Sequence, residues 1–182
     1  MTGPTHRVLS ENEVLSRLKS RRGQPGYLAM FSSWLGGVIT DPALMQIPLD
    51  DHLVHRGHGV FDTCTLSDGN LYRLGVHMDR LLTSAALARI EHSWTKEDLI
   101  RMVMDTASHA GVKDGAVRYW LTAGPGGFSP SPQECDEPCF YCIIIDPVPL
   151  GGTRSDPMSV GIPEATVLDT PMKPPLLATI KS

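Results

Sequence analysis

The sequence predicts an α+β fold over residues 27–146, in which helices pack on one side of a mainly antiparallel sheet. Residues 60–66 are rich in β-branched and aromatic side chains, which suit a half-buried strand. Turn-forming residues follow at 67–70, and residues 71–74 return as the second strand of a hairpin. Apolar residues then recur at three- and four-residue spacings, which predicts a helix near 75–90.

The remaining helices and strands are predicted from the same kinds of signal, namely apolar spacing and end residues. Thr95 and Asp98 resemble a capping box at the start of a second helix near 96–110, and Gly111 is a suitable stop. Residues 27–40 contain two short strands around a Gly-Gly hairpin signal. Further elements are expected as strands at 117–122 and 140–145 and as a basic amphipathic helix at 11–22.

The composition is that of an ordinary soluble globular protein, with 41% apolar and 20% charged residues in 182 positions. A formal net charge of −4 argues against a nucleic-acid partner. No apolar run approaches the ~18 residues of a membrane-spanning helix. Residues 1–10 lack the apolar core of a signal peptide, so we expect a cytoplasmic location, or a plastid if a transit peptide is missing from this form.

The sequence does not predict a metal site. Three cysteines lie close together in residues 135–142, but Cys139 and Cys142 would point to opposite faces of a strand. No second Cys/His pair has the spacing of a zinc finger. The three histidines of residues 52–58 recur at every third position and do not share a strand face, so we interpret them as loop and pocket residues.

Three segments occur in an order that is typical of one enzyme family: residues 57–63 (GHGVFDT), 77–81 (HMDRL) and 178–182 (ATIKS). They resemble the class IV (fold type IV) pyridoxal-phosphate enzymes, which include D-amino-acid and branched-chain aminotransferases and aminodeoxychorismate lyase. The first segment is similar to the signature G-D-G-[VI]-[FY]-E-[TV], and the second to [HE]-[LIM]-x-R-L. The third is similar to the I-K-S that carries the Schiff-base lysine. Residues 54–63 are most similar to plant-type D-amino-acid transaminase-like proteins.

The resemblance implies a division of the chain into four segments. Residues 1–26 would form an N-terminal helix and lead-in, and residues 27–146 the small N-terminal domain of a fold type IV enzyme. The many prolines of residues 147–177 suit an interdomain linker. Residues 178–182 would then begin the cofactor domain, the rest of which is missing, so that the second domain is truncated.

The resemblance also implies the cofactor, pyridoxal 5'-phosphate, and the residues that bind it. Lys181 is expected to be the catalytic lysine, which bonds to the cofactor aldehyde and then moves the proton at the α-carbon of the amino acid. Arg80 is expected to bind the phosphate, because a guanidinium offers paired donors. Phe61, His58 and Arg118 are expected to line the substrate pocket.

The expected activity is transfer of an amino group between an amino acid, of D- or branched-chain type, and a 2-oxo acid, by a homodimer. The alternatives are an aminodeoxychorismate lyase-like enzyme, or a truncated, non-catalytic fragment that retains only the small domain. The D-amino-acid transaminases of the family bind the substrate carboxylate with an Arg-x-His pair in the loop that corresponds to residues 123–138. Those residues contain no Arg or His, so a different anchor is implied. The 182-residue form is expected to be inactive.

Overall fold

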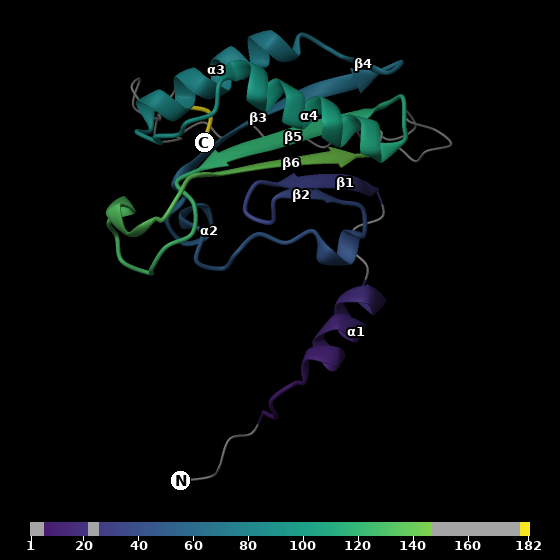
Figure 1. The fold of residues 1–182 in the computed structure, drawn as a ribbon, viewed down its shortest axis with the longest axis vertical. Coiled ribbons are helices and arrows are strands. Elements are labelled where there is room, and N and C mark those ends of the chain that lie inside the picture. Colours follow the sequence, from purple (N-terminus) through teal and green to yellow (C-terminus); the bar gives the residue numbers. More distant parts are fainter. Residues whose placement is uncertain (1–5, 22–25, 147–178) are drawn as a thin grey trace, which may run out of the picture.

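The computed structural model describes residues 6–21, 26–146 and 179–182, and it shows the expected α+β fold (Figure 1). Within these residues, six strands form one antiparallel sheet in the order β2-β1-β6-β5-β3-β4. The strands are β1 (Tyr27–Ser32), β2 (Gly37–Ile39), β3 (Gly59–Ser67), β4 (Asn70–Leu71), β5 (Gly115–Thr122) and β6 (Cys139–Ile145). The helices are α1 (Glu11–Arg21), α2 (His52–Arg56), α3 (Leu74–Leu87) and α4 (Lys96–Ala110), with 3-10 turns at Pro42–Leu44 and Pro132–Glu134.

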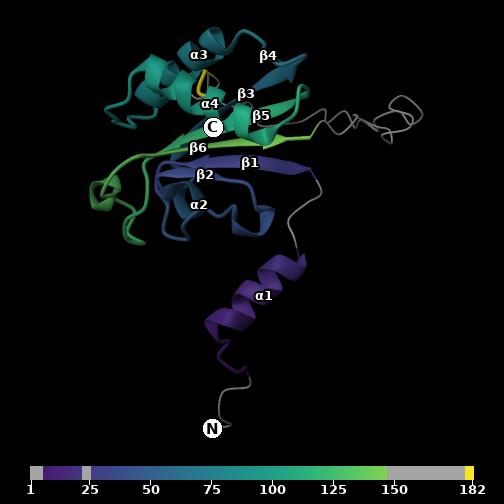
Figure 2. The ribbon, with the colours of Figure 1, turned by 45° about the vertical axis from the view of Figure 1, so that its right-hand side comes forward.

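Helices α3 and α4 lie side by side on one face of the sheet (Figures 1 and 2). Alternate residues of the central strands point toward them, because successive side chains of a strand face opposite sides. Met78 and Leu81 of α3 and Leu99 and Val103 of α4 are fully buried against those strands. Burial of each such side chain contributes roughly 1.5–3 kcal/mol, so this core fixes both helices to the sheet.

Helix α4 has the start and the stop that the sequence predicts. The Thr95 hydroxyl accepts a hydrogen bond from the Asp98 backbone N at 3.1 Å, and the Asp98 carboxylate accepts one from the Thr95 backbone N at 3.0 Å. Gly111 ends the helix at φ +67°, in the left-handed region that glycine adopts without strain. The prediction of a helix at 96–110 is therefore confirmed.

The second strand of the predicted hairpin is shorter than expected. Strand β4 ends at Leu71, Arg73 turns the chain at φ 49°, and Leu74 begins α3. Leu74 is buried in the core beneath the helices, and this burial favours an early helix start over a continued strand. The prediction of a strand over 71–74 is wrong beyond Leu71, and the helix predicted near 75–90 extends from residue 74 to residue 87.

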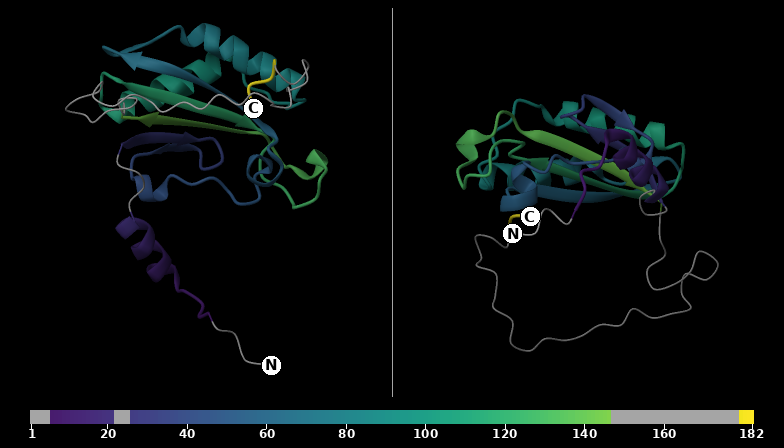
Figure 3. Two further views of the ribbon diagram at one scale, coloured as in Figure 1. Left: turned by 180° about the vertical axis from the view of Figure 1, so that it is seen from behind. Right: turned by 90° about the horizontal axis from the view of Figure 1, so that it is seen from below.

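Helix α1 extends away from the sheet (Figures 2 and 3). It agrees with the helix predicted at 11–22 as far as the chain is described, and it contacts the 3-10 turn Pro42–Leu44. Its Val14 and Leu15 side chains are exposed. The predicted linker at 147–177 lies outside the described residues, and of the segment predicted to follow it the structure describes 179–182.

The segment between β5 and β6 is held against α2. Asp51 is fully buried and accepts hydrogen bonds from the hydroxyls of Tyr141 at 2.8 Å and Thr122 at 3.0 Å. The His52 backbone N donates to the Gly124 carbonyl at 3.0 Å. The sequence alone leaves this segment unassigned, and these long-range bonds fix where it leaves the sheet.

Candidate functional site

A buried carboxylate on β3 is the centre of the candidate site. Asp62 is fully buried, because its position in the strand alternation directs it toward α3 rather than solvent. Arg80 of α3 binds it through two parallel bonds, Nε to Oδ2 at 2.7 Å and Nη2 to Oδ1 at 2.5 Å. This two-point pairing fixes the orientation of the guanidinium as well as its position.

The end of the chain returns to the same carboxylate. Lys181 Nζ lies 3.2 Å from Asp62 Oδ1 and 5.6 Å from the centre of the Phe61 ring. The Lys181 carbonyl accepts a hydrogen bond from the Phe61 backbone N at 2.9 Å, and its own N donates to Ser84 Oγ at 3.4 Å. Residues 179–182 therefore lie along β3 and beneath α3, as the view from behind shows (Figure 3).

The charges around Asp62 favour its ionised form. Burial opposes ionisation, but the hydrogen bonds from Arg80 and the Thr63 backbone N and the ammonium of Lys181 outweigh it, so the pKa of Asp62 falls to about 2. The same pairing raises the pKa of Arg80. His77 Nδ1 lies 3.1 Å from Arg80 Nη2, and because a guanidinium can only donate, this ring nitrogen acts as the acceptor.

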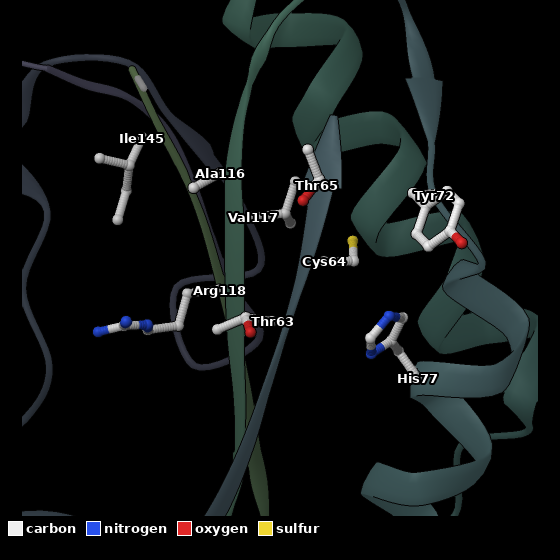
Figure 4. A pocket seen from close by; sticks show the side chains of 9 residues that line it. All are labelled: Thr63, Cys64, Thr65, Tyr72, His77, Ala116, Val117, Arg118 and Ile145. Atoms are coloured by element: carbon white, nitrogen blue, oxygen red, sulfur yellow. The ribbon is translucent and has the colours of Figure 1, made fainter. Parts of the chain in front are cut away.

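A cavity of about 490 Å³ lies next to this ion cluster (Figure 4). Thr63 of β3 and Arg118 of β5 are cross-strand partners, and Figure 4 shows them together, with His77 on the α3 side of β3. Arg118 is exposed and forms no ion pair with any residue in the described part of the chain. A guanidinium beside hydroxyl groups suits a ligand that carries a carboxylate. The lining residues are Thr63, Cys64, Thr65, Tyr72, His77, Ala116, Val117, Arg118 and Ile145.

His58 lies elsewhere. Its Nε2 lies 2.9 Å from the Ala88 carbonyl, just beyond the end of α3. It lines a second cavity, of about 430 Å³, together with Arg89, Glu91 and residues of the segment before β6. The structure thus brings Lys181, Arg80 and Phe61 together around Asp62, whereas Arg118 and His58 each line a separate cavity.

Sequence reasoning missed Asp62 and His77 as members of the site. A signal for Asp62 was present, since the other inward-facing residues of its strand, Val60, Cys64 and Leu66, are apolar. A carboxylate at such a position must be paired, because an unpaired buried charge is costly. His77 carried a weaker signal, its place one helical turn before Arg80.

Neither a metal cluster nor a membrane span is found in the part of the chain that the structure describes. No three potential ligands among its His, Cys, Asp and Glu residues gather at one point. Within the same residues, no helix has both the length and the apolar character needed to cross a bilayer.

Comparison with known proteins identifies the family. The profile of the family described as "Amino-transferase class IV" matches residues 59–182. The chloroplastic D-amino-acid transaminase of Arabidopsis thaliana is 46% identical over 175 residues, which cover 96% of this chain and 45% of that protein. A putative branched-chain-amino-acid aminotransferase of Methanocaldococcus jannaschii is 33% identical over 119 residues, covering 65% of this chain and 41% of that protein.

Solved structures share the fold. The branched-chain amino acid aminotransferase of Escherichia coli superposes with a TM-score of 0.61 at 18% identity, covering 69% of this chain and 42% of that one. A T.th. enzyme of the same name, solved with pyridoxamine 5'-phosphate, gives 0.60 at 16% identity, covering 68% and 41%. The chain spans less than half the length of the relatives it matches. The family profile covers most of its residues, including Asp62, Arg80 and Lys181, and the chain belongs to the class IV aminotransferases.

Proposed function

We propose that this chain forms the small domain and the lysine segment of a pyridoxal 5'-phosphate-dependent aminotransferase. The reaction moves an amino group between an amino acid, of D- or branched-chain type, and a 2-oxo acid. The observation that carries the proposal is the convergence of Arg80 and Lys181, from distant parts of the sequence, on Asp62.

The donor set around Asp62 fits the cofactor. Arg80 uses Nε and Nη2 on Asp62 and His77, which leaves Nη1 without a partner among the described residues, on a side chain that is 49% exposed. Such a guanidinium suits a phosphate group. Lys181 is 33% exposed at its side chain, so its amine is accessible to an aldehyde.

The chemistry is divided between the cofactor and the chain. The cofactor supplies an electron-accepting ring when it is bound. Lys181 would hold the cofactor through its aldehyde group and would carry the proton to and from the α-carbon of the substrate. Arg80 would hold the phosphate.

Arg118 is the proposed anchor of the substrate carboxylate, and the neighbouring Thr63 hydroxyl supports it. Phe61, beside Lys181, would contact the substrate side chain. His58 would border the substrate path through Nδ1, because its Nε2 is occupied by the Ala88 carbonyl. In this arrangement Arg118 of the sheet takes the place of the Arg-x-His pair that this chain lacks in residues 123–138.

The assembly and location follow the family and its relatives. We infer a homodimer in the cytoplasm, or in a plastid, as the name of the Arabidopsis thaliana relative states for that protein. A lyase acting on aminodeoxychorismate is the second candidate. It is favoured by a 30% identical relative, the bifunctional aminodeoxychorismate lyase / D-amino acid transaminase of Mycobacterium tuberculosis. Production of pyruvate from aminodeoxychorismate, without a 2-oxo acid acceptor, would identify the lyase.

The test is to trap the cofactor on its lysine. The protein is incubated with excess pyridoxal 5'-phosphate and reduced with borohydride, and the labelled peptides are quantified by mass spectrometry. We expect Lys181 to be labelled well before Lys96, a matched control whose side chain is 31% exposed and paired with Asp79 at 2.6 Å. Arg80→Ala should weaken cofactor binding by ~1.5–3 kcal/mol, the value of a charge-assisted hydrogen bond. Equal labelling of Lys181 and Lys96 would refute the proposal.

A further inference from the structure

We propose that Asp62 is a positioning residue that holds Arg80 permanently and Lys181 reversibly, so that the lysine can leave for the cofactor while the arginine stays. This inference rests on the proposed function and assigns Asp62 a role that it performs through Arg80 and Lys181.

The distances around the two carboxylate oxygens differ. Oδ1 accepts from Arg80 Nη2 at 2.5 Å, from the Thr63 backbone N at 2.6 Å and from Lys181 Nζ at 3.2 Å. Oδ2 accepts from Arg80 Nε at 2.7 Å. Charge-assisted N–H···O bonds are usually about 2.7–2.9 Å long, so the contact of Lys181 is the weakest of the four.

Departure of Lys181 leaves the buried carboxylate satisfied. Three short bonds remain, two from Arg80 and one from Thr63, so the carboxylate is not left as an uncompensated buried charge. Departure of Arg80 would instead remove a donor from each oxygen. Asp62 therefore separates a fixed cation from a mobile one, although both contact the same atom.

The length of the side chain contributes to this division. The family signature carries a glutamate where this chain has Asp62. The short aspartate side chain accepts a hydrogen bond from the backbone N of the next residue, Thr63, at 2.6 Å. This local bond ties the carboxylate to its own strand. A glutamate would keep the charge but place the carboxylate one methylene further from the backbone, whereas an asparagine would keep the length but remove the charge. Comparing Asp62→Glu with Asp62→Asn therefore separates the effect of charge from that of side-chain length.

The test compares probes with and without a phosphate. Labelling of Lys181 is measured by borohydride trapping with pyridoxal 5'-phosphate and with pyridoxal, and their ratio reports how well Arg80 selects the phosphate. We expect Asp62→Asn to lower the ratio about tenfold or more, because the guanidinium loses its fixed orientation. Asp62→Glu should keep the ratio within about threefold of the parent. Asp79→Asn, which removes an exposed carboxylate from the helix that carries Arg80, should leave the ratio unchanged.

The ratio distinguishes positioning from general damage to the fold, because a loosened fold lowers labelling by both probes together. An unchanged ratio in Asp62→Asn, or an equal loss in Asp62→Asn and Asp62→Glu, would overturn the inference while leaving the proposed function intact. Failure of the parent protein to label Lys181 in preference to Lys96 would instead overturn the proposed function, and the inference with it.

A second variant covers the case in which Asp62→Asn does not fold. Lys181→Met removes the mobile cation and leaves the pair of Asp62 and Arg80. Its affinity for pyridoxine 5'-phosphate, a probe that has no aldehyde, should stay within about threefold of the parent by equilibrium dialysis. A loss of tenfold or more would show that Arg80 depends on Lys181, and would overturn the inference.

Discussion

Replacing Asp62 with asparagine should reduce the stability of the protein in a pH-dependent way. The pKa of this carboxyl falls from the ordinary 3.8 to about 2 in the folded protein, and each unit corresponds to about 1.4 kcal/mol. The ionised form therefore contributes about 2 kcal/mol to the free energy of unfolding. Because the folded pKa is depressed, this contribution is complete above pH 4 and is lost as the pH falls toward 2.

The assay is urea unfolding followed by circular dichroism at pH 7, 5, 3 and 2. At pH 7 the Asp62→Asn variant should be less stable than the parent by about 2 kcal/mol, and the two unfolding free energies should converge between pH 4 and pH 2. Asp79→Asn serves as the control for loss of an exposed carboxylate. A constant difference between parent and Asp62→Asn across this pH range would refute the reasoning, because it would show that the carboxyl has the same pKa folded and unfolded.

Urea unfolding at pH 7 also tests four further substitutions. Gly124→Ala should lower the free energy of unfolding by about 3 kcal/mol or more, because Gly124 has φ +93° and an added Cβ would meet the Glu137 carbonyl. Gly36→Ala, with φ +73° and open space around the residue, should lower it by only about 1 kcal/mol. Thr95→Ala should cost about 1 kcal/mol through loss of the capping box, and a change below about 0.3 kcal/mol would contradict that role. Tyr119→Phe should be neutral or stabilising by up to about 1 kcal/mol, since the buried Tyr119 hydroxyl has no partner among the described residues; a clear loss of stability would contradict this.

The local elements were predictable because their signals lie within a few residues of one another. The capping box at Thr95 and the left-handed Gly111 set both ends of α4 as expected. The strand at β3 followed from its β-branched and aromatic residues. The sequence placed Leu74 both at the end of the return strand and on the apolar face of the helix, and its burial in the core against distant strands favours the helix.

The site was predictable only in part, for the same reason. Arg80 and Lys181 were identified through short segments that resemble the family. The pairing of both with Asp62 joins residues 18 and 119 positions apart, and no local pattern reports such a contact. The buried Asp51, which binds Tyr141 across 90 positions, was missed in the same way.

Strand β4 ends at Leu71 and not at residue 74 as predicted, and this early end bears on the proposed chemistry. Strand β4 pairs with β3 only at Leu66 and Ser67, so the outer edge of β3 is open at Phe61. The Phe61 backbone N uses this opening to bind the Lys181 carbonyl, which fixes the lysine backbone while its amine reaches Asp62. A longer hairpin strand would continue along the same edge of β3 toward the bond that Lys181 occupies. The turn at Arg73 that ends β4 therefore leaves open the edge on which the candidate catalytic lysine is positioned.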